Sequence, residues 1–166
     1  MKVTGYKLRQ AIKEMETARD LLAARFADCL KEFEGEEKPD PIDVMKLYEA
    51  AEKDLASLQT AQTQYNVLVR VPGLGILLSE AIKQVGGAGR VEKMWKVVAT
   101  GPKNRYGFES DSRSKDMIVA KLKVSAESAG GLAKRAGKWA SSLREAIQLG
   151  NAIEVDIEGL DPELFE

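Results

Sequence analysis

Two stretches of this chain, residues 8–33 and 44–69, repeat apolar side chains at alternating steps of four and three residues. That spacing places every member of a stretch on one side of an α-helix. The first stripe consists of Leu8, Ile12, Met15, Arg19, Leu22, Phe26, Cys29 and Phe33, and the second of Val44, Tyr48, Ala51, Leu55, Leu58, Gln62, Tyr65 and Val69. Two such helices in succession predict a helical hairpin with coiled-coil-like packing. The stripes can cover each other within one chain or pair between chains, and the pattern leaves both options open.

The segment between the stripes contains residues that end one helix and begin the next. Gly35 suits a C-terminal cap, Asp40 suits an N-terminal cap, and Pro41 suits the first turn of the following helix. Each helix would be about 40 Å long at a rise of ~1.5 Å per residue.

One polar residue interrupts each stripe, Arg19 in the first and Gln62 in the second. A polar side chain at such a position usually lowers stability but can set the register or the number of partner helices. We therefore predict that Arg19 and Gln62 are interaction residues that specify assembly.

The middle of the chain predicts an interrupted helix. Residues 71–75 have the composition of a turn, and Ser79 is a candidate cap for a third helix. Interior glycines cost ~1 kcal/mol each relative to alanine. The glycine cluster at 86–89 should therefore end or sharply weaken that helix, and residues 91–99 can resume as a helix. Residues 100–114 predict a polar loop that a partner could order.

Residues 117–124 and 152–158 alternate apolar and charged side chains, which is typical of half-buried strands. Lysines in the first segment and acids in the second favour an antiparallel pair. A helix is expected between them, over residues 126–149, with Ser125 as its cap.

This last helix carries two stripes. The first is an apolar core face of Leu132, Ala136, Trp139, Leu143 and Ala146, and the second consists of the small residues Ala126, Gly130, Ala133, Gly137 and Ala140. Small residues allow another helix to approach closely. That helix can belong to the same chain or to a symmetry-related copy, and Gly130, Gly137 and Trp139 are the candidate interaction residues.

The residue types that carry the commonest chemistry are scarce. The absence of histidine removes the commonest general base and the usual imidazole ligand of zinc, and the single cysteine cannot form an internal disulfide. Cys29 is expected to be a small core side chain. We assign no catalytic, cofactor-binding or metal-ligating residue. An enzyme that uses other residues, such as Glu92, Asp111 or Asp116, stays an alternative.

Length and composition predict a single domain over residues 1–166. Its parts would be the hairpin over 1–70, the glycine-interrupted helix and loop over 71–116, and a strand–helix–strand region with an acidic tail over 117–166. No apolar run approaches the length of a membrane span, and no leader sequence precedes the first helix. We therefore expect no membrane partner and a cytoplasmic location.

Charge is unevenly distributed along the chain. Residues 1–78 hold 11 Lys+Arg against 13 Asp+Glu, residues 79–138 hold 13 against 6, and residues 139–166 hold 1 against 7. The basic middle and the acidic tail can be solvated surfaces, or they can pair with each other within a chain or between chains. A nucleic-acid surface is the third option and the least favoured, because the basic residues are dispersed and the tail would compete for them. Its candidate residues are Lys83, Arg90, Lys93, Lys96, Lys103 and Arg105.

A series of short motifs punctuates the predicted helices. They are Glu34-Gly35-Glu36, Pro39-Asp40-Pro41, Asn66, Leu78-Ser79-Glu80-Ala81, and Leu143-Arg144-Glu145-Ala146-Ile147-Gln148 with Asn151. Their order over most of the chain resembles the bacterial family known as septicolysin. The glycine cluster at 86–89 departs from that family, in which the third helix is unbroken, and Ala152 stands where a tryptophan usually follows. The resemblance implies a helical hairpin and brings no established activity.

The sequence thus predicts a mainly α protein with a long antiparallel helical hairpin, further helices and a small two-stranded β element. Surplus packing faces, complementary charge blocks and missing catalytic residue types favour a non-enzymatic, self-associating structural or scaffold protein. Its expected partners are further copies of itself and other proteins of a larger particle.

Overall fold

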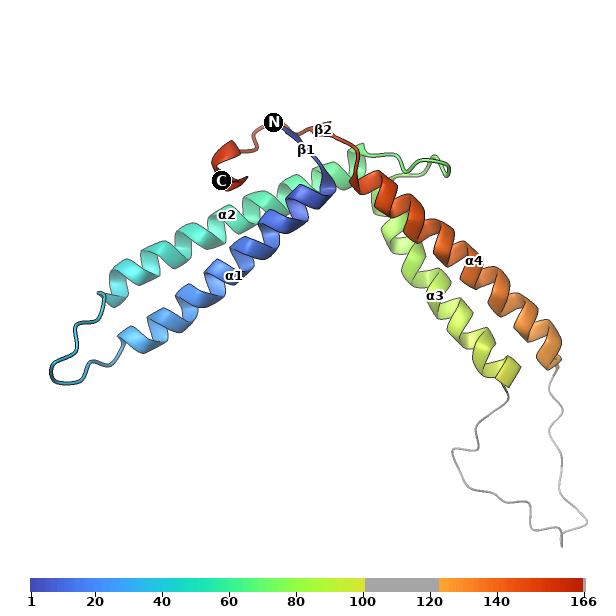
Figure 1. Cartoon of the computed structure of the whole chain (residues 1–166), viewed down its shortest axis with the longest axis horizontal. Coiled ribbons are helices and arrows are strands. Elements are labelled where there is room, and N and C mark those ends of the chain that lie inside the picture. The colour runs from blue at the N-terminus through green and yellow to red at the C-terminus, as the bar shows by residue number, and fades with distance from the viewer. Residues whose placement is uncertain (101–122, 166) are drawn as a thin grey trace, which may run out of the picture. The chain divides into compact units, whose positions relative to one another are not determined.

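The computed structural model describes residues 1–100 and 123–165, which form four α-helices, a two-stranded sheet and a short 3-10 helix (Figure 1). The helices are α1 (Gly5–Cys29), α2 (Pro41–Leu68), α3 (Leu78–Thr100) and α4 (Ala126–Asn151), and the 3-10 helix spans Pro162–Phe165. The strands are β1 (Lys2–Val3) and β2 (Val155–Asp156). The predicted fold class, mainly α with a long hairpin and a small two-stranded element, is confirmed.

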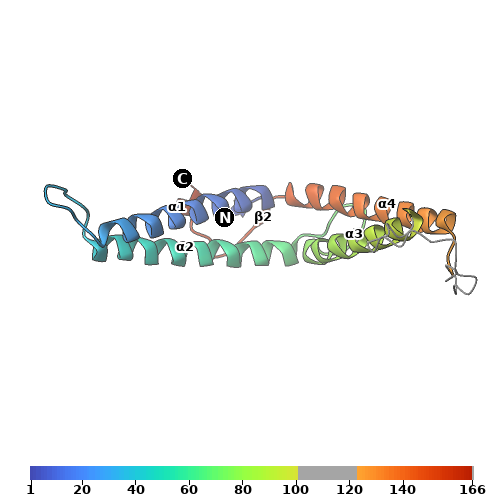
Figure 2. The ribbon, with the colours of Figure 1, turned by 90° about the horizontal axis from the view of Figure 1, so that it is seen from below.

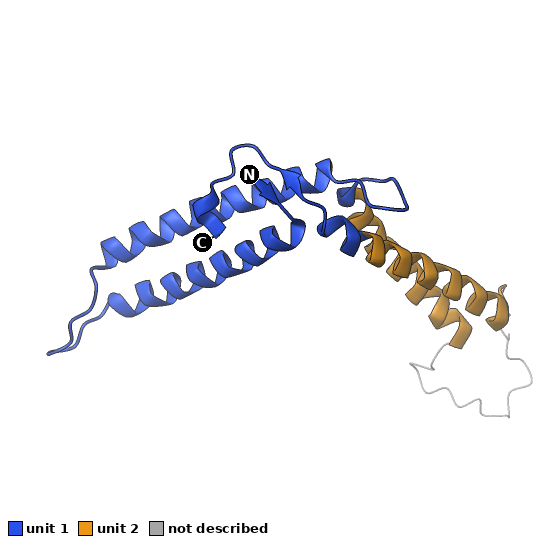
Figure 3. Cartoon of the chain, turned by 45° about the horizontal axis from the view of Figure 1, so that its top comes forward, with its two compact units in different colours: residues 1–79, 147–166 blue, residues 80–146 orange. Residues whose placement is uncertain are grey.

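The chain divides into two compact units (Figure 3). Unit 1 comprises residues 1–79 and 147–166, and unit 2 comprises residues 80–146. The boundaries fall inside α3 and α4, so the start of α3 and the end of α4 belong to unit 1. The single-domain interpretation of the sequence stays a prediction.

Unit 1 is built on the hairpin of α1 and α2, which lie side by side in both views (Figures 1 and 2). Their facing sides are the two stripes expected from the sequence. Buried members are Leu8, Ile12 and Cys29 on α1, and Val44, Ala51, Leu55, Leu58 and Tyr65 on α2, followed by Val69. Cys29 is 7% exposed, which confirms its place in the core.

The helix ends differ in part from the expectation. The Asp40 carboxylate accepts a hydrogen bond from the Ile42 backbone N–H at 2.8 Å, and Pro41 is the first residue of α2, as predicted. Helix α1, however, ends at Cys29 with Leu30 as its cap. Gly35 therefore does not cap it but adopts a positive φ of 88° in the connecting loop. Phe33 was wrongly placed on the stripe, because it lies beyond the helix and is 72% exposed.

The sheet brings the two ends of unit 1 together. β1 pairs antiparallel with β2, with Val3 opposite Val155. The segment after β2 then lies along α1 and α2, where Ile157 is buried and Leu160 nearly so. The strand predicted within 152–158 is thus confirmed as a shorter strand. Its predicted partner, 117–124, lies outside the described residues except for Lys123 and Val124, which form a bend.

A tight turn joins the hairpin to α3. Gly73 and Gly75 have positive φ angles of 77° and 68°, and the Arg70 guanidinium donates to the Gly75 carbonyl at 2.9 Å. This confirms the turn over residues 71–75. Helix α3 begins at Leu78, two residues earlier than expected, so Ser79 lies inside the helix rather than at its cap.

The predicted break at the glycine cluster is wrong, because α3 runs without interruption through residues 86–89. None of these glycines has a positive φ, so their backbone conformation is one that alanine also adopts. The low helix propensity of these glycines costs a few kcal/mol in total, which is insufficient to end a helix of this length. Helix α4 matches the expectation, with the Ser125 hydroxyl accepting from the Ser128 backbone N–H at 3.1 Å.

Candidate interaction surface

Small side chains form the seam between the helices of unit 2, α3 and α4. The fully or nearly buried apolar residues of this unit are Ala81, Ala129, Ala133, Ala140, Leu143 and Ala146. Five of these six are alanines. A seam of alanines lets two helices approach closely but covers little apolar area, since hydrophobic stabilisation scales with the area removed from water. The two helices of this unit thus bury few of their larger apolar side chains.

Those larger side chains lie outside the seam and border a groove. The groove has a volume of about 640 Å³ and runs along one face of α3 and α4. We call it the α3–α4 groove. It is lined by Gln84, Gly87, Ala88, Val91, Trp95, Leu132, Arg135, Ala136 and Trp139. Val91 is 47% exposed and Trp139 is 43% exposed. Met94, one helical turn beyond Val91, is 71% exposed.

The other face of unit 2 is polar. Glu92 and Lys96 form an ion pair across one turn of α3, at 2.6 Å. The Lys96 ammonium lowers the pKa of the Glu92 carboxyl. Ser141, Ser142, Lys134 and Lys138 of α4 lie around this pair. Unit 2 is therefore amphipathic, with one apolar grooved face and one charged face.

The candidate interaction residues of α4 have different surroundings in the structure. A Cβ atom on Gly137 would lie 2.9 Å from the Glu92 carboxylate, so this glycine does provide space for a group on α3. A Cβ on Gly130 would meet no described atom within 4 Å. The prediction that Trp139 belongs to a core face is wrong, because the indole borders the open groove. Leu132 and Ala136 are half-buried beside it, whereas Leu143 and Ala146 are buried as expected.

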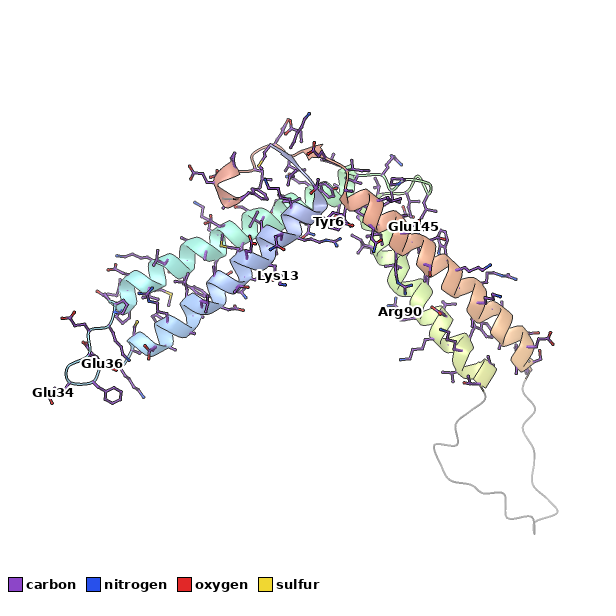
Figure 4. The ribbon with its side chains drawn as sticks, in the orientation of Figure 1. Tyr6, Lys13, Glu34, Glu36, Arg90 and Glu145 are labelled. Atoms are coloured by element: carbon purple, nitrogen blue, oxygen red, sulfur yellow. The ribbon has the colours of Figure 1, made fainter. Side chains whose placement is uncertain are left out.

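The basic candidates do not form one compact patch. Lys83, Arg90, Lys93 and Lys96 are all exposed along α3, and Arg90 is labelled in Figure 4. Their positions differ by three or seven residues, so they follow one side of the helix as a row rather than a cluster. Lys96 is paired with Glu92. Lys103 and Arg105 lie outside the described residues.

The two polar interruptions of the hairpin stripes have different surroundings. The Arg19 guanidinium pairs with the neighbouring Asp20 at 2.7 Å and reaches Glu52 of α2 at 3.8 Å. Asp20 is the main cause of a raised pKa for Arg19. The Tyr48 hydroxyl donates to the same Glu52 at 2.8 Å. Gln62 is half-buried on α2. Arg19 thus forms a polar contact between the helices, which is compatible with a role in setting register.

Two asparagines, half-buried Asn66 and fully buried Asn151, have buried side-chain oxygens without partners in the described part of the chain. They are Asn66 Oδ1 and Asn151 Oδ1. The Asn151 amide nitrogen donates to the Ile147 carbonyl at 2.7 Å, and its oxygen faces Gly5. Both belong to the motifs that resemble the septicolysin family. The pockets of unit 1 beside Ala61, Ala11 and Val67 are lined by neither residue.

The described residues contain neither a cluster of metal ligands nor a helix suited to cross a membrane. No group of three or more Cys, Asp or Glu side chains there could hold a metal ion. Among the four helices, none combines the length and the apolar character that crossing a membrane would require.

Comparisons with known proteins identify a similar fold. No family model and no curated protein matches this chain. A crystal structure of a functionally unknown conserved protein from Corynebacterium diphtheriae is similar, with a TM-score of 0.65 and 16% sequence identity. The match covers 94% of this chain and 100% of that one. At this identity the likeness shows the fold alone, and the resemblance to the septicolysin family stays a prediction.

The sequence patterns do not predict the groove as a whole. The prediction that Leu132, Ala136 and Trp139 of its α4 wall share one helix face is correct. Its α3 wall was divided by the expected break at the glycines. Read as one helix, Gln84, Ala88, Val91 and Trp95 follow at steps of four, three and four residues. That continuous stripe was the signal that could have predicted the groove.

Proposed function

We propose that this protein is a non-enzymatic, self-associating structural protein, and that the α3–α4 groove is the surface through which it associates. The observation that carries the proposal is that Trp139 and Val91, which are 43% and 47% exposed, line an apolar groove rather than the core of unit 2. Large apolar side chains gathered in one place are typical of interaction surfaces, and tryptophan is enriched among the residues that dominate binding energy.

The thin seam of unit 2 supports the same proposal. A pair of helices held mainly by alanines gains little free energy from its own burial, whereas helices added against the groove would bury aromatic and aliphatic side chains on both walls. Association would therefore stabilise the unit as well as assemble the protein. The polar face with Glu92 and Lys96 would remain in solvent.

A pair of valine substitutions on α3 tests the proposal. Val91 lines the groove and is 47% exposed, whereas Val97 is 57% exposed and does not line it. We expect Val91→Asn to weaken self-association by about tenfold or more, as for other central interface residues. Val97→Asn should leave it unchanged. Light scattering coupled to size-exclusion chromatography at several concentrations measures both.

The outcome that contradicts the proposal is equally clear. If the wild-type protein is a monomer at every concentration, or if both valine variants associate as the wild type does, the groove is not a self-association surface. Retention of the wild type on DNA or RNA at low salt, lost steeply as salt rises, would instead favour the nucleic-acid alternative.

A further inference from the structure

Charge is sorted between the two units of the fold. Unit 1 carries 11 Lys+Arg against 19 Asp+Glu, a net charge of −8, and unit 2 carries 14 against 7, a net charge of +7. The near-neutral total of −1 therefore hides two strongly charged halves of opposite sign. Opposite charge of this size steers association and selects the partner surface.

The α3–α4 groove lies within the basic unit and has cations at its edge. Arg135 lines the groove directly. Lys83 and Arg90 are spaced four and three residues from Gly87, another lining residue, and therefore lie on the ridge beside it. All three side chains are exposed, and in the described structure none forms an ion pair. Two copies that joined groove to groove would bring these cations together, which disfavours that arrangement.

The matching surface is the far half of the hairpin of unit 1. Residues 14–54 hold 13 Asp+Glu against 6 Lys+Arg, and they include every acid of residues 1–79. This half also exposes large apolar side chains, namely Leu21, Leu30, Phe33, Ile42 and Leu47, which are each 55–72% exposed. Glu34 and Glu36 lie in the loop at its end (Figure 4). Apolar side chains among acids are the complement of an apolar groove edged by cations.

We propose that the α3–α4 groove of one copy receives the far half of the α1–α2 hairpin, residues 14–54, of a second copy. This rests on the proposed function, because it names the occupant of the same groove. Each copy then offers one groove and one hairpin, and the contact is head-to-tail. Such a contact repeats from copy to copy, and it produces either a closed ring or a filament.

Complementation between two damaged variants tests this arrangement. The groove variant is Val91→Asn, and the hairpin variant combines Glu34→Lys with Phe33→Ser, both at exposed loop positions. Each variant alone should lose at least tenfold in affinity. Mixed in equal amounts, they should form a one-to-one dimer and nothing larger, because one intact groove and one intact hairpin remain. Circular dichroism of each variant checks that the helices are retained.

The ionic-strength dependence provides a second measurement. Raising salt from about 0.1 M to about 1 M shortens the Debye length from ~10 Å to ~3 Å. We expect wild-type association to weaken by about tenfold or more over this range, because it joins opposite charges.

The possible results separate the two proposals. If the wild type associates and Val91→Asn weakens it, but the hairpin variant assembles normally, the groove is an interface and the hairpin is not its occupant. Self-association that strengthens with salt likewise overturns the head-to-tail arrangement while leaving the proposed function in place. A wild type that never associates overturns both.

Discussion

The Tyr65 hydroxyl of α2 lies 2.7 Å from the carbonyl oxygen of Gly150, near the end of α4. The same hydroxyl lies 2.7 Å from the Ile153 carbonyl, so one donor serves two acceptors. Tyr65 is fully buried, and a Cβ atom on Gly5 would collide with its ring and with Asn151. Residues 85 positions apart are thus joined in the core of unit 1.

Tyr65→Phe is expected to destabilise unit 1 by ~1–3 kcal/mol, because it removes the hydroxyl that donates to the buried Gly150 carbonyl and to the partly buried Ile153 carbonyl. Urea denaturation followed by circular dichroism measures the change. Tyr6→Phe is the matched control. The Tyr6 hydroxyl donates to the Gln148 carbonyl at 3.0 Å, but Tyr6 is 48% exposed, so water can replace the bond. An equal loss in both variants would contradict a special role for Tyr65.

Alkaline pH provides an independent test of the same residue. Burial raises the pKa of Tyr65 above its ordinary value of 10.0. The folded state therefore holds this proton more tightly than the unfolded state. The stabilisation is fully present below pH ~10 and is lost as the pH rises toward the higher folded pKa. The stability difference between wild type and Tyr65→Phe should shrink above pH ~10, and a difference that is constant with pH would contradict the assignment.

Alanine substitutions test whether α3 is one continuous helix. Gly89 has a helical φ and open space around its Cβ position, so Gly89→Ala should stabilise the protein by ~0.5–1 kcal/mol. Gly73 also has open space but a φ of +77°, so Gly73→Ala should destabilise it by about 1 kcal/mol. Thermal unfolding of both variants shows whether each substitution raises or lowers the stability. Destabilisation by Gly89→Ala would mean that the helix does break there.

Arg19→Leu is expected to raise the melting temperature and to broaden the distribution of oligomers. Leucine would extend the apolar stripe of α1, and the ion pairs that it removes are largely solvent-exposed and therefore contribute little. Arg9→Leu, at an exposed position of the same helix outside residues 14–54, should change neither property. Differential scanning calorimetry and light scattering report them. A lower melting temperature with unchanged assembly would count against a register role for Arg19.

Periodicity predicted the hairpin well because its stripes are long. Each contains eight positions with one polar interruption, and the Asp40–Pro41 pair marks the start of α2 unambiguously. Strand β1 was missed for the opposite reason. Lys2–Val3 is too short to show alternation, and its pairing with β2 depends on a contact between the two ends of the chain. A local pattern carries no information about such a contact.

The candidate site was predicted less completely, because a helical stripe does not reveal what will cover it. Leu132, Ala136 and Trp139 share a face, and core burial was the natural interpretation. In unit 2 the alanine stripe forms the seam instead, and the tryptophan face borders a groove. Two apolar stripes on one helix compete for burial, and shape complementarity with the neighbouring helix decides between them.

Sedimentation velocity of the wild-type protein, from low to high micromolar concentration at physiological salt, tests the central claim most directly. We predict an average mass that rises with concentration and reaches multiples of the monomer, because the proposed assembly covers the Trp139 face with a second copy. One species with the mass of the monomer throughout the range would contradict the claim.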